Sequence, residues 1–209
     1  MKDEIQRIIS GENQVKYGDI IQTIIRYLRR SQEASRVDKT SKQFREEEEK
    51  YLRDFVEKNQ LWVTNINLNN YISEGAEQKV YLRDGKSVWK LNDAIFYSSW
   101  SDYLVNLLLN NYFFADTAYQ LKGFFTDNQT LYAVVEQAFV KANQKTDLLL
   151  VQQFMQANGF LNTRNNDYYH PEWGIILEDL HDENVLTQND VLYFIDTVFY
   201  VVSPKTSSN

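Results

Sequence analysis

Residues 177–186 read LEDLHDENVL and residues 194–196 read FID, and this part of the sequence decides the fold. Two short apolar runs, at 184–186 and 191–195, flank the polar residues 188–190. Apolar runs of strand length around a polar turn predict a β-hairpin. The FID motif closes the returning strand, so it is expected to lie beside the end of the LEDLHDENVL motif.

Three polar side chains of these motifs point to one kind of chemistry. Asp179 and Asn184 are five residues apart, and Asp196 follows twelve residues later. Because paired strands lie about 4.8 Å apart, the hairpin is expected to bring Asn184 and Asp196 close together. Amide and carboxylate oxygens are hard ligands that suit Mg²⁺, which completes its coordination with water and phosphates. A free Asp179 carboxylate at the same place would orient an acceptor hydroxyl.

This segment resembles the catalytic loop of the protein-kinase-like fold in its aminoglycoside-phosphotransferase-like version. There, the pattern Asp-Leu-His-x-x-Asn precedes hydrophobic strands and a metal-binding Asp. The resemblance implies the catalytic-base position for Asp179 and the metal positions for Asn184 and Asp196. His181 matches the His of the pattern, and it is expected to brace the loop rather than to take part in chemistry.

The segment ISEGAEQKVY at 72–81 is similar to the glycine-rich hairpin G-x-G-x-x-G-x-V that covers the phosphates in this fold. Only the middle glycine, Gly75, is present, and Ser73 and Gln78 occupy the outer positions. The resemblance implies that Ser73, Gly75 and Val80 bind the nucleotide.

The run VWKL resembles the V-A-I-K strand and gives Lys90 the catalytic role of holding the α- and β-phosphates. The helix expected after this strand has no Glu to pair with the lysine, and Asp102 is the nearest substitute. Residues 134–139, VVEQAF, occupy the position of the hinge. The resemblance implies that the backbone there, at Glu136 and Gln137, binds the adenine.

More narrowly, the chain resembles the kinase-like domain of bacterial polyvalent proteins of mobile elements, especially from Bacteroidetes. The resemblance covers roughly residues 15–200, and the phrases that carry it are GAEQKVY, KLND, VVEQ, GIILEDLHDENVL and LYFID. It implies an α+β, minimal bilobal kinase-like fold with a small antiparallel N-lobe sheet. The expected domains are a helical extension packed on the core (1–67), the N-lobe and hinge (68–140) and a truncated C-lobe (141–209).

The sequence pattern predicts the elements of these regions. Residues 1–60 have apolar residues at helical spacing, with the acidic run Glu46–Glu49 as a solvated helix face and a polar loop at 31–42. The next region is expected to contain strands and one helix, at 79–82, 87–91, 99–114 (the helix), 119–125 and 131–136, with a further short strand at 62–64. The last region is expected to begin with a helix at 146–157, closed by Gly159, and to continue with a polar loop at 162–167.

Two departures from the kinase pattern leave the function open. Thr197 and Val198 follow Asp196 in place of Phe-Gly. Only 13 residues follow Asp196, so the C-lobe is expected to be truncated. For the same reason, the acceptor is not expected to be a peptide docked in the usual kinase manner. The first hypothesis is an ATP- and Mg²⁺-dependent phosphotransferase with an unknown small-molecule or protein acceptor. The alternatives are an inactive pseudokinase or interaction module of a mobile element, and a helical interaction protein that works through residues 1–60.

The amino-acid composition excludes several other classes of function and partner. The chain of 209 residues has no Cys and two His, which excludes disulfides, thiol catalysis and Cys-ligated metals. A net charge of −7 argues against nucleic acid or an anionic membrane as a partner. The N-terminus lacks the continuous apolar core of a signal peptide, and a cytoplasmic location is expected.

Overall fold

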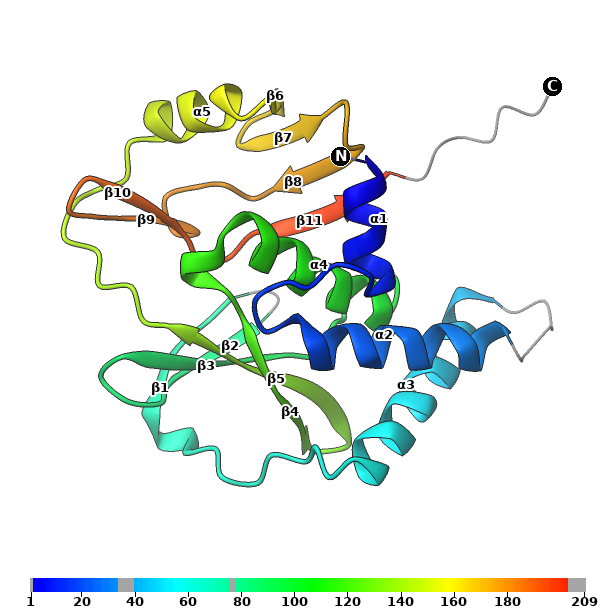
Figure 1. Cartoon of the computed structure of the whole chain (residues 1–209). Coiled ribbons are helices and arrows are strands. Elements are labelled where there is room, and N and C mark those ends of the chain that lie inside the picture. The colour runs from blue at the N-terminus through cyan, green and yellow to red at the C-terminus, as the bar shows by residue number, and fades with distance from the viewer. Residues whose placement is uncertain (1, 34–39, 76–77, 203–209) are drawn as a thin grey trace, which may run out of the picture. The chain divides into compact units, whose positions relative to one another are not determined.

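The computed structural model describes residues 2–33, 40–75 and 78–202 and is an α+β protein (Figure 1). The chain divides into two compact units. One contains residues 8–139, and the other contains residues 140–209 together with residues 1–7. Helix α1 (Lys2–Ser10) crosses the boundary between them.

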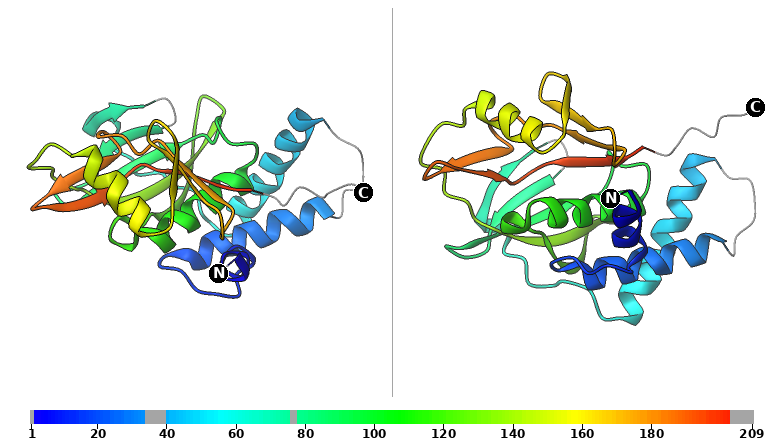
Figure 2. Two further views of the ribbon diagram at one scale, coloured as in Figure 1. Left: turned by 90° about the horizontal axis from the view of Figure 1, so that it is seen from above. Right: turned by 45° about the horizontal axis from the view of Figure 1, so that its top comes forward.

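The helices of the larger unit follow the predicted apolar pattern. Helix α2 (Gly18–Glu33) buries an apolar stripe and packs against helix α3 (Ser41–Lys58) (Figure 2). The rings of Tyr27 in α2 and Phe55 in α3 are in contact, with their centroids 4.9 Å apart. The stripe consists of Ile21, Ile24, Ile25 and Leu28. The loop expected at 31–42 is shorter than predicted, since α2 continues to Glu33 and α3 begins at Ser41. Residues 34–39 of that loop lie outside the described residues.

The acidic run Glu46–Glu49 is predicted to be solvated, and for Glu48 this prediction is wrong. Glu48 is only 1% exposed, and its carboxylate accepts hydrogen bonds from the main-chain N–H groups of Trp100 and Ser101. These N–H groups lie at the start of helix α4 (Trp100–Phe113), where the helix dipole favours a negative charge. A pattern of charges within one helix could not predict this, because the partner is a different helix.

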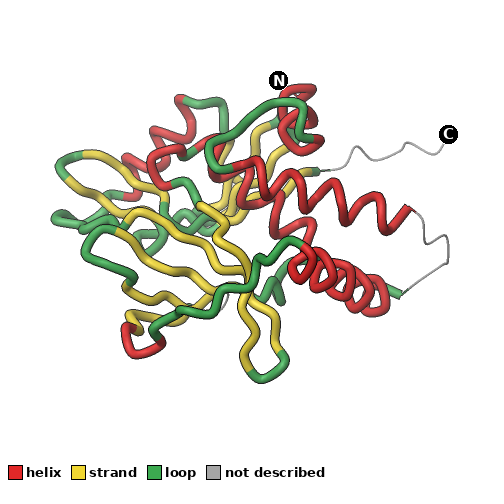
Figure 3. Tube along the Cα trace, turned by 60° about the horizontal axis from the view of Figure 1, so that its bottom comes forward, coloured by secondary structure: helices red, strands yellow, loops and turns green. Residues whose placement is uncertain are grey.

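A five-stranded antiparallel sheet completes this unit (Figure 3). Its strand order is β1-β2-β3-β5-β4, with bounds β1 (Tyr71–Glu74), β2 (Gln78–Leu82), β3 (Ser87–Asn92), β4 (Gln120–Asp127) and β5 (Thr130–Ala138). Short 3₁₀ turns at Leu68–Asn70 and Ala115–Thr117 precede β1 and β4. The predicted order strand, strand, helix, strand, strand is confirmed for β2, β3, α4, β4 and β5.

Each face of this sheet is covered by a different part of the chain. Helix α4 covers one face, where the ring of Trp100 lies 6.0 Å from that of Phe124 in β4. The segment before β1 covers the other face, where its residues Val63 and Ile66 pack against a buried cluster of the sheet. This cluster consists of Tyr81, Leu91 and Val134. Both faces of the sheet are therefore buried in part, and the face with α4 also contains Lys90.

The strand predicted at 62–64 does not form. Trp62 makes a single bridge to Phe124, and the N–H of Val63 donates to the carbonyl of Phe124 at 2.7 Å. The N–H of Phe124 in turn donates to the carbonyl of Leu61 at 2.8 Å. Gly123 makes this approach possible, because a Cβ at its φ of +145° would overlap the Leu61 carbonyl oxygen.

The smaller unit contains one long helix and two sheets. Helix α5 (Leu148–Ala157) ends as predicted at Gly159, whose N–H donates to the carbonyl of Gln156. A four-stranded antiparallel sheet has the order β11-β8-β7-β6, and a two-stranded hairpin pairs β9 with β10. The bounds are β6 (Leu161–Arg164), β7 (Asp167–His170), β8 (Ile175–Glu178), β9 (Val185–Gln188), β10 (Val191–Phe194) and β11 (Val198–Val201).

The polar loop predicted at 162–167 is wrong, because β6 and β7 form a hairpin there. Every residue of β6 is exposed, so the strand has no alternation of apolar and polar residues that could reveal it. The turn is made by Asn165, whose φ is +47°. Strand β11 is a further element that the sequence analysis did not predict.

Candidate functional site

Asp179 lies in a tight loop directly after β8, and its backbone adopts a left-handed φ of +70°. The side chain of Asn184 closes the loop, since its Nδ2 donates to the main-chain oxygen of Asp179 at 2.9 Å and to Oδ2 at 3.2 Å. A non-glycine residue keeps such a backbone only where its surroundings hold it. Asn184 is therefore one of the groups that fix the position of Asp179.

His181 lies inside the same loop and contacts it through both ring nitrogens. Nδ1 accepts a hydrogen bond from the N–H of Glu183 at 3.3 Å, and Nε2 lies 3.2 Å from Nδ2 of Asn184. Nε2 also lies 3.3 Å from Oδ1 of Asp179. These contacts agree with the predicted bracing of the loop by His181.

The hairpin β9–β10 brings Asn184 and Asp196 together, as predicted. The carbonyl of Asn184 accepts hydrogen bonds from the N–H groups of Ile195 at 2.9 Å and of Asp196 at 3.4 Å. Residues Asn189 and Asp190 make the turn with φ values of +50° and +63°, which is the geometry of a type I′ hairpin. Asp196 lies two residues beyond β10 rather than inside the strand.

Oxygen atoms at this point of the smaller unit suit a hard cation. Both hydrogen bonds of the Asn184 side chain to Asp179 are donated by Nδ2, which leaves its Oδ1 for another partner. Within residues 2–33, 40–75 and 78–202, no group of three or more His, Cys, Asp or Glu is arranged to hold a metal ion. A cation held by Asn184 and Asp196 would therefore need further ligands from water or phosphate, as Mg²⁺ commonly does.

Two more carboxylates lie near Asp179. Oδ1 of Asp167 accepts a hydrogen bond from the N–H of Asp179 at 3.1 Å. Burial raises the pKa of Glu178 above its usual value, and the charges of Asp167 and Asp179 raise it further. Asp167 was not among the predicted site residues, because its position beside Asp179 depends on the unpredicted β6–β7 hairpin.

In the larger unit, the sheet aligns three of the predicted nucleotide-binding residues. Ser73 is paired with Val80, Val80 with Lys90, and Lys90 with Val135. Directly paired residues of antiparallel strands lie on the same face, so this row of side chains points one way. Val135 lies two residues from Ala133, so their side chains are on the same face of the sheet, and Ala133 is paired with Phe124. The row therefore lies on the face that α4 covers. Lys90 is buried, with its Nζ 5.5 Å from the centre of the Tyr119 ring.

The loop expected over the phosphates lies between β1 and β2. The N–H of Gly75 donates to the carbonyl of Gln78 at 3.0 Å, which closes the hairpin. Residues 76 and 77 lie outside the described residues. A Cβ on Gly75 would meet no heavy atom of the described residues within 4 Å, so the space beside Gly75 is open.

Asp102, the nearest substitute for an acidic partner of the lysine, caps a helix. It is exposed, and Oγ of Ser99 donates to its Oδ2 at 2.8 Å, while the N–H of Asp102 donates to Oγ of Ser99 at 3.0 Å. These bonds cap the N-terminus of α4. Lys90 is buried and lies against Tyr119.

Glu136 and Gln137 lie inside β5 rather than in a linker after it. Glu136 is paired with Trp89 on one side and Gln120 on the other, and Nε2 of the buried Gln137 donates to the carbonyl of Thr117 at 2.7 Å. The side chain of Glu136 forms ion pairs with Arg83 and Lys122. Gln137 and Ala138 are paired with β3 but lie beyond the last residue pair of β4 and β5, and the N–H of Phe139 donates to the carbonyl of Lys86 at 2.8 Å. The boundary between the two units falls between residues 139 and 140.

Buried asparagines of α4, which were not among the predicted site residues, bond the chain around this helix. Asn111 exchanges two hydrogen bonds with the main chain of Tyr119, the residue that lies against Lys90: its Nδ2 donates at 2.8 Å and its Oδ1 accepts at 2.6 Å. Asn106 and Asn110 are also buried. The signal was three asparagines within the otherwise apolar run NLLLNN.

The comparison with known protein families places the chain in one of them. A family model described as a serine/threonine/tyrosine kinase found in polyvalent proteins matches residues 45–203, which is more than half of the chain. The chain belongs to this family. The predicted resemblance is thereby confirmed. No curated protein and no solved structure matches the chain.

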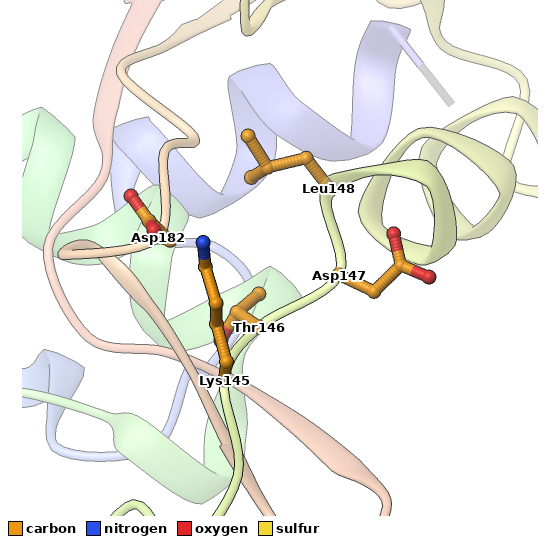
Figure 4. Close-up of a pocket in the computed structure, with 5 residues that line it drawn as sticks. All are labelled: Lys145, Thr146, Asp147, Leu148 and Asp182. Carbon is orange, nitrogen blue, oxygen red and sulfur yellow. The ribbon is translucent and has the colours of Figure 1, made fainter.

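This member of the polyvalent-protein kinase family has a pocket of about 430 Å³ beside the Asp179 loop (Figure 4). It is lined by Lys145, Thr146, Asp147, Leu148 and Asp182. Thr146 anchors its wall, since Oγ1 donates to the carbonyl of Val185 at 2.6 Å. Lys145 extends toward the side of the pocket on which Asp182 lies, whereas Asp147 points away from it. The sequence analysis assigned no function to these residues.

In the part of this kinase-family chain that the structure describes, no helix has the length and apolar character needed to cross a membrane.

Proposed function

We propose that the chain is an ATP- and Mg²⁺-dependent phosphotransferase that acts on a hydroxyl acceptor. The observation that carries the proposal is the loop in which Asn184 bonds Asp179 through its side chain and Asp196 through its carbonyl. Asp179 is the carboxylate predicted to orient the acceptor, and Asn184 and Asp196 are the two predicted metal ligands, so the loop joins all three. Membership of the kinase family supports the same reaction class.

Asn184 and Asp196 would hold Mg²⁺, which would supply positive charge to the phosphates. The donor set fits such an ion, because it offers one carboxylate and one amide oxygen and leaves most ligand positions to phosphate and water. Asp179, held by Asn184 and His181, would accept a hydrogen bond from the attacking hydroxyl. This chemistry relies on positioning and charge rather than on covalent work by the protein.

In the larger unit, Lys90 would contact the phosphates, and Ser73, Gly75 and Val80 would bind the nucleotide beside it. The pairing of Ser73, Val80 and Lys90 in one row supports this assignment. We assign residues 68–140 to an N-lobe with hinge, residues 1–67 to its helical extension and residues 141–209 to a truncated C-lobe. That Lys90, Asp179, Asn184 and Asp196 serve one nucleotide stays a prediction.

A second candidate function is nucleotide binding without transfer, as in a pseudokinase. The observation that favours it is the segment at 72–81, where only the middle glycine, Gly75, of the three glycines in the phosphate-covering hairpin is present. Kinases use this glycine-rich hairpin to cover the phosphates. The two candidates share the nucleotide and metal and differ only in whether phosphate is transferred.

A thermal-shift titration with ATP tests both candidates, first without metal and then with Mg²⁺ or Mn²⁺. A ligand that binds only the native state raises the melting temperature by mass action. We expect a shift that requires the divalent ion and that Asp196→Asn reduces. Release of ADP in the same samples would establish transfer, whereas a shift without ADP release would favour the pseudokinase. A melting temperature that ATP and metal leave unchanged would refute both.

A further inference from the structure

Asp179 needs support from its surroundings, because its φ of +70° is unfavourable for a residue with a side chain. Asn184 supplies part of that support by donating to the carbonyl oxygen and the carboxylate of Asp179. The N–H of Asp179 points to a different element. It donates to Oδ1 of Asp167 at 3.1 Å, so side chains satisfy the backbone groups of Asp179 on both sides.

The β6–β7 hairpin offers two consecutive acceptors to two consecutive N–H groups. Asp167 accepts from Asp179, and the main-chain oxygen of Asn166 accepts from Leu180 at 3.2 Å. Asp167 is itself held in the hairpin, since its main-chain oxygen accepts from Nδ2 of Asn162 at 3.1 Å and from Oγ1 of Thr163 at 3.2 Å. The hairpin is therefore a fixed support for the start of the loop.

We infer that Asp167 is a positioning residue, which sets the backbone of Asp179 so that its carboxylate faces the acceptor hydroxyl. The catalytic meaning of this inference rests on the proposed phosphotransferase function. Asp167 acts through the N–H of Asp179 and does not itself contact the acceptor. Its essential property is an oxygen acceptor at the end of a short side chain, rather than its negative charge.

This distinction determines the variants. Asp167→Ala removes the acceptor, whereas Asp167→Asn keeps an oxygen at the same place and removes only the charge. Asn166→Ala is a matched control on the same turn, because the bond to Leu180 uses the main-chain oxygen, which the substitution retains. All three are made in the full chain, and their melting temperatures are measured first.

Hydrogen exchange of the Asp179 amide, followed by NMR, tests the contact without any need for activity. We expect Asp167→Ala to raise its exchange rate about tenfold, as for loss of one hydrogen bond, and the other two variants to leave it near the wild-type rate. Unchanged exchange in a folded Asp167→Ala variant would overturn the inference. If Asp167→Ala does not fold, the exchange rate in Asp167→Asn tests the inference. Fast exchange of the Asp179 amide in Asp167→Asn would contradict the requirement for an oxygen acceptor.

Transfer from ATP is measured with the same variants and Mg²⁺. We expect Asp167→Ala to lower kcat about tenfold or more with little change in KM for ATP, and Asp167→Asn to restore kcat. Equal loss of kcat in Asp167→Asn would refute the assigned role. If the wild type transfers no phosphate, the proposed function fails, while the exchange data still decide whether Asp167 holds Asp179.

Discussion

The carboxylate of Glu48 accepts a hydrogen bond from the main-chain N–H of Trp100 at 2.7 Å, although the two residues are 52 positions apart. The same carboxylate accepts from the N–H of Ser101 and from Nε2 of Gln32. Glu48 therefore ties α3 and α2 to the first turn of α4. Since α4 covers the face of the sheet that contains Lys90, this buried glutamate links the N-terminal helices to the proposed nucleotide-binding surface.

Removal of this carboxylate should destabilise the larger unit. Glu48→Ala leaves the first N–H groups of α4 without their acceptor, and we expect a loss of about 1–3 kcal/mol in the free energy of unfolding, measured in urea. Glu48→Gln should cost less, because one oxygen remains. Glu46→Gln is the matched control on the exposed side of the same helix. Equal, small effects of Glu48→Ala and Glu46→Gln would contradict the structural role of Glu48.

Arg45 should be needed for the geometry of its guanidinium rather than for its charge. Its two terminal nitrogens donate to four main-chain oxygens in the β3–α4 loop, those of Asp93, Ala94, Ile95 and Tyr97. A lysine cannot reproduce this fork. Arg45→Lys is expected to cost about 1–3 kcal/mol in urea unfolding.

The loop that Arg45 holds also contains exposed Ile95 and Phe96. We therefore expect faster chymotrypsin cleavage after Phe96 in Arg45→Lys than in the wild type, under native conditions. Lys42→Arg, on the exposed side of the same helix, is the control. Cleavage at the wild-type rate in Arg45→Lys would show that the loop is held by other contacts.

The roles proposed for Asp179 and Asp196 predict different defects. Asp179→Asn should lower kcat about a hundredfold or more and nearly spare the binding of ATP with Mg²⁺, because Asp179 would contact the acceptor. Asp196→Asn should weaken metal-dependent ATP binding about tenfold, because it removes a charged ligand of Mg²⁺. Calorimetric titration with ATP, with and without Mg²⁺, separates the two. Equal loss of binding in both variants would mean that the roles are assigned wrongly.

His170 should make stability depend on pH. It is buried between the rings of Phe160 and Trp173, and burial lowers its pKa below the ordinary value of 6.5. The unfolded chain therefore binds a proton at a higher pH than the folded chain does. As the pH falls below about 6.5, the free energy of unfolding should decrease until the folded-state pKa is reached.

The variant His170→Phe keeps an aromatic ring and removes the titrating group. Its free energy of unfolding should therefore decrease less than that of the wild type between pH 7.5 and pH 5, about the ordinary pKa. Urea unfolding at each pH gives this difference directly, and any constant offset from changed packing cancels. Parallel curves for wild type and variant would assign the acid sensitivity to other groups.

Local signals in the sequence were enough for the helices, the hairpin turns at Asp84 and Asn189, and the Asp179 loop. The apolar stripe of α2 repeats at helical spacing, and the turn at Asp84 is closed by its own side chain, which accepts from the N–H groups of Lys86 and Ser87 at 2.8 Å. Asn184 and Asp196 approach each other for a similar reason, since the turn between β9 and β10 sets their register. Such features depend on neighbours within about a dozen residues, so the local sequence pattern can predict them.

Contacts between distant segments were decided only by the tertiary structure. The burial of Glu48, the capping role of Asp102 and the contact of Asp167 with Asp179 each depend on which element packs nearby. The β6–β7 hairpin is the clearest case, because its exposed edge strand has no apolar alternation and takes its place from pairing with β8. The sequence by itself therefore determined the local geometry and the reaction class to test. Packing across the chain decided which charged groups support that chemistry, because the burial of a single charged residue and the pairing of an exposed edge strand leave no periodic trace in the sequence.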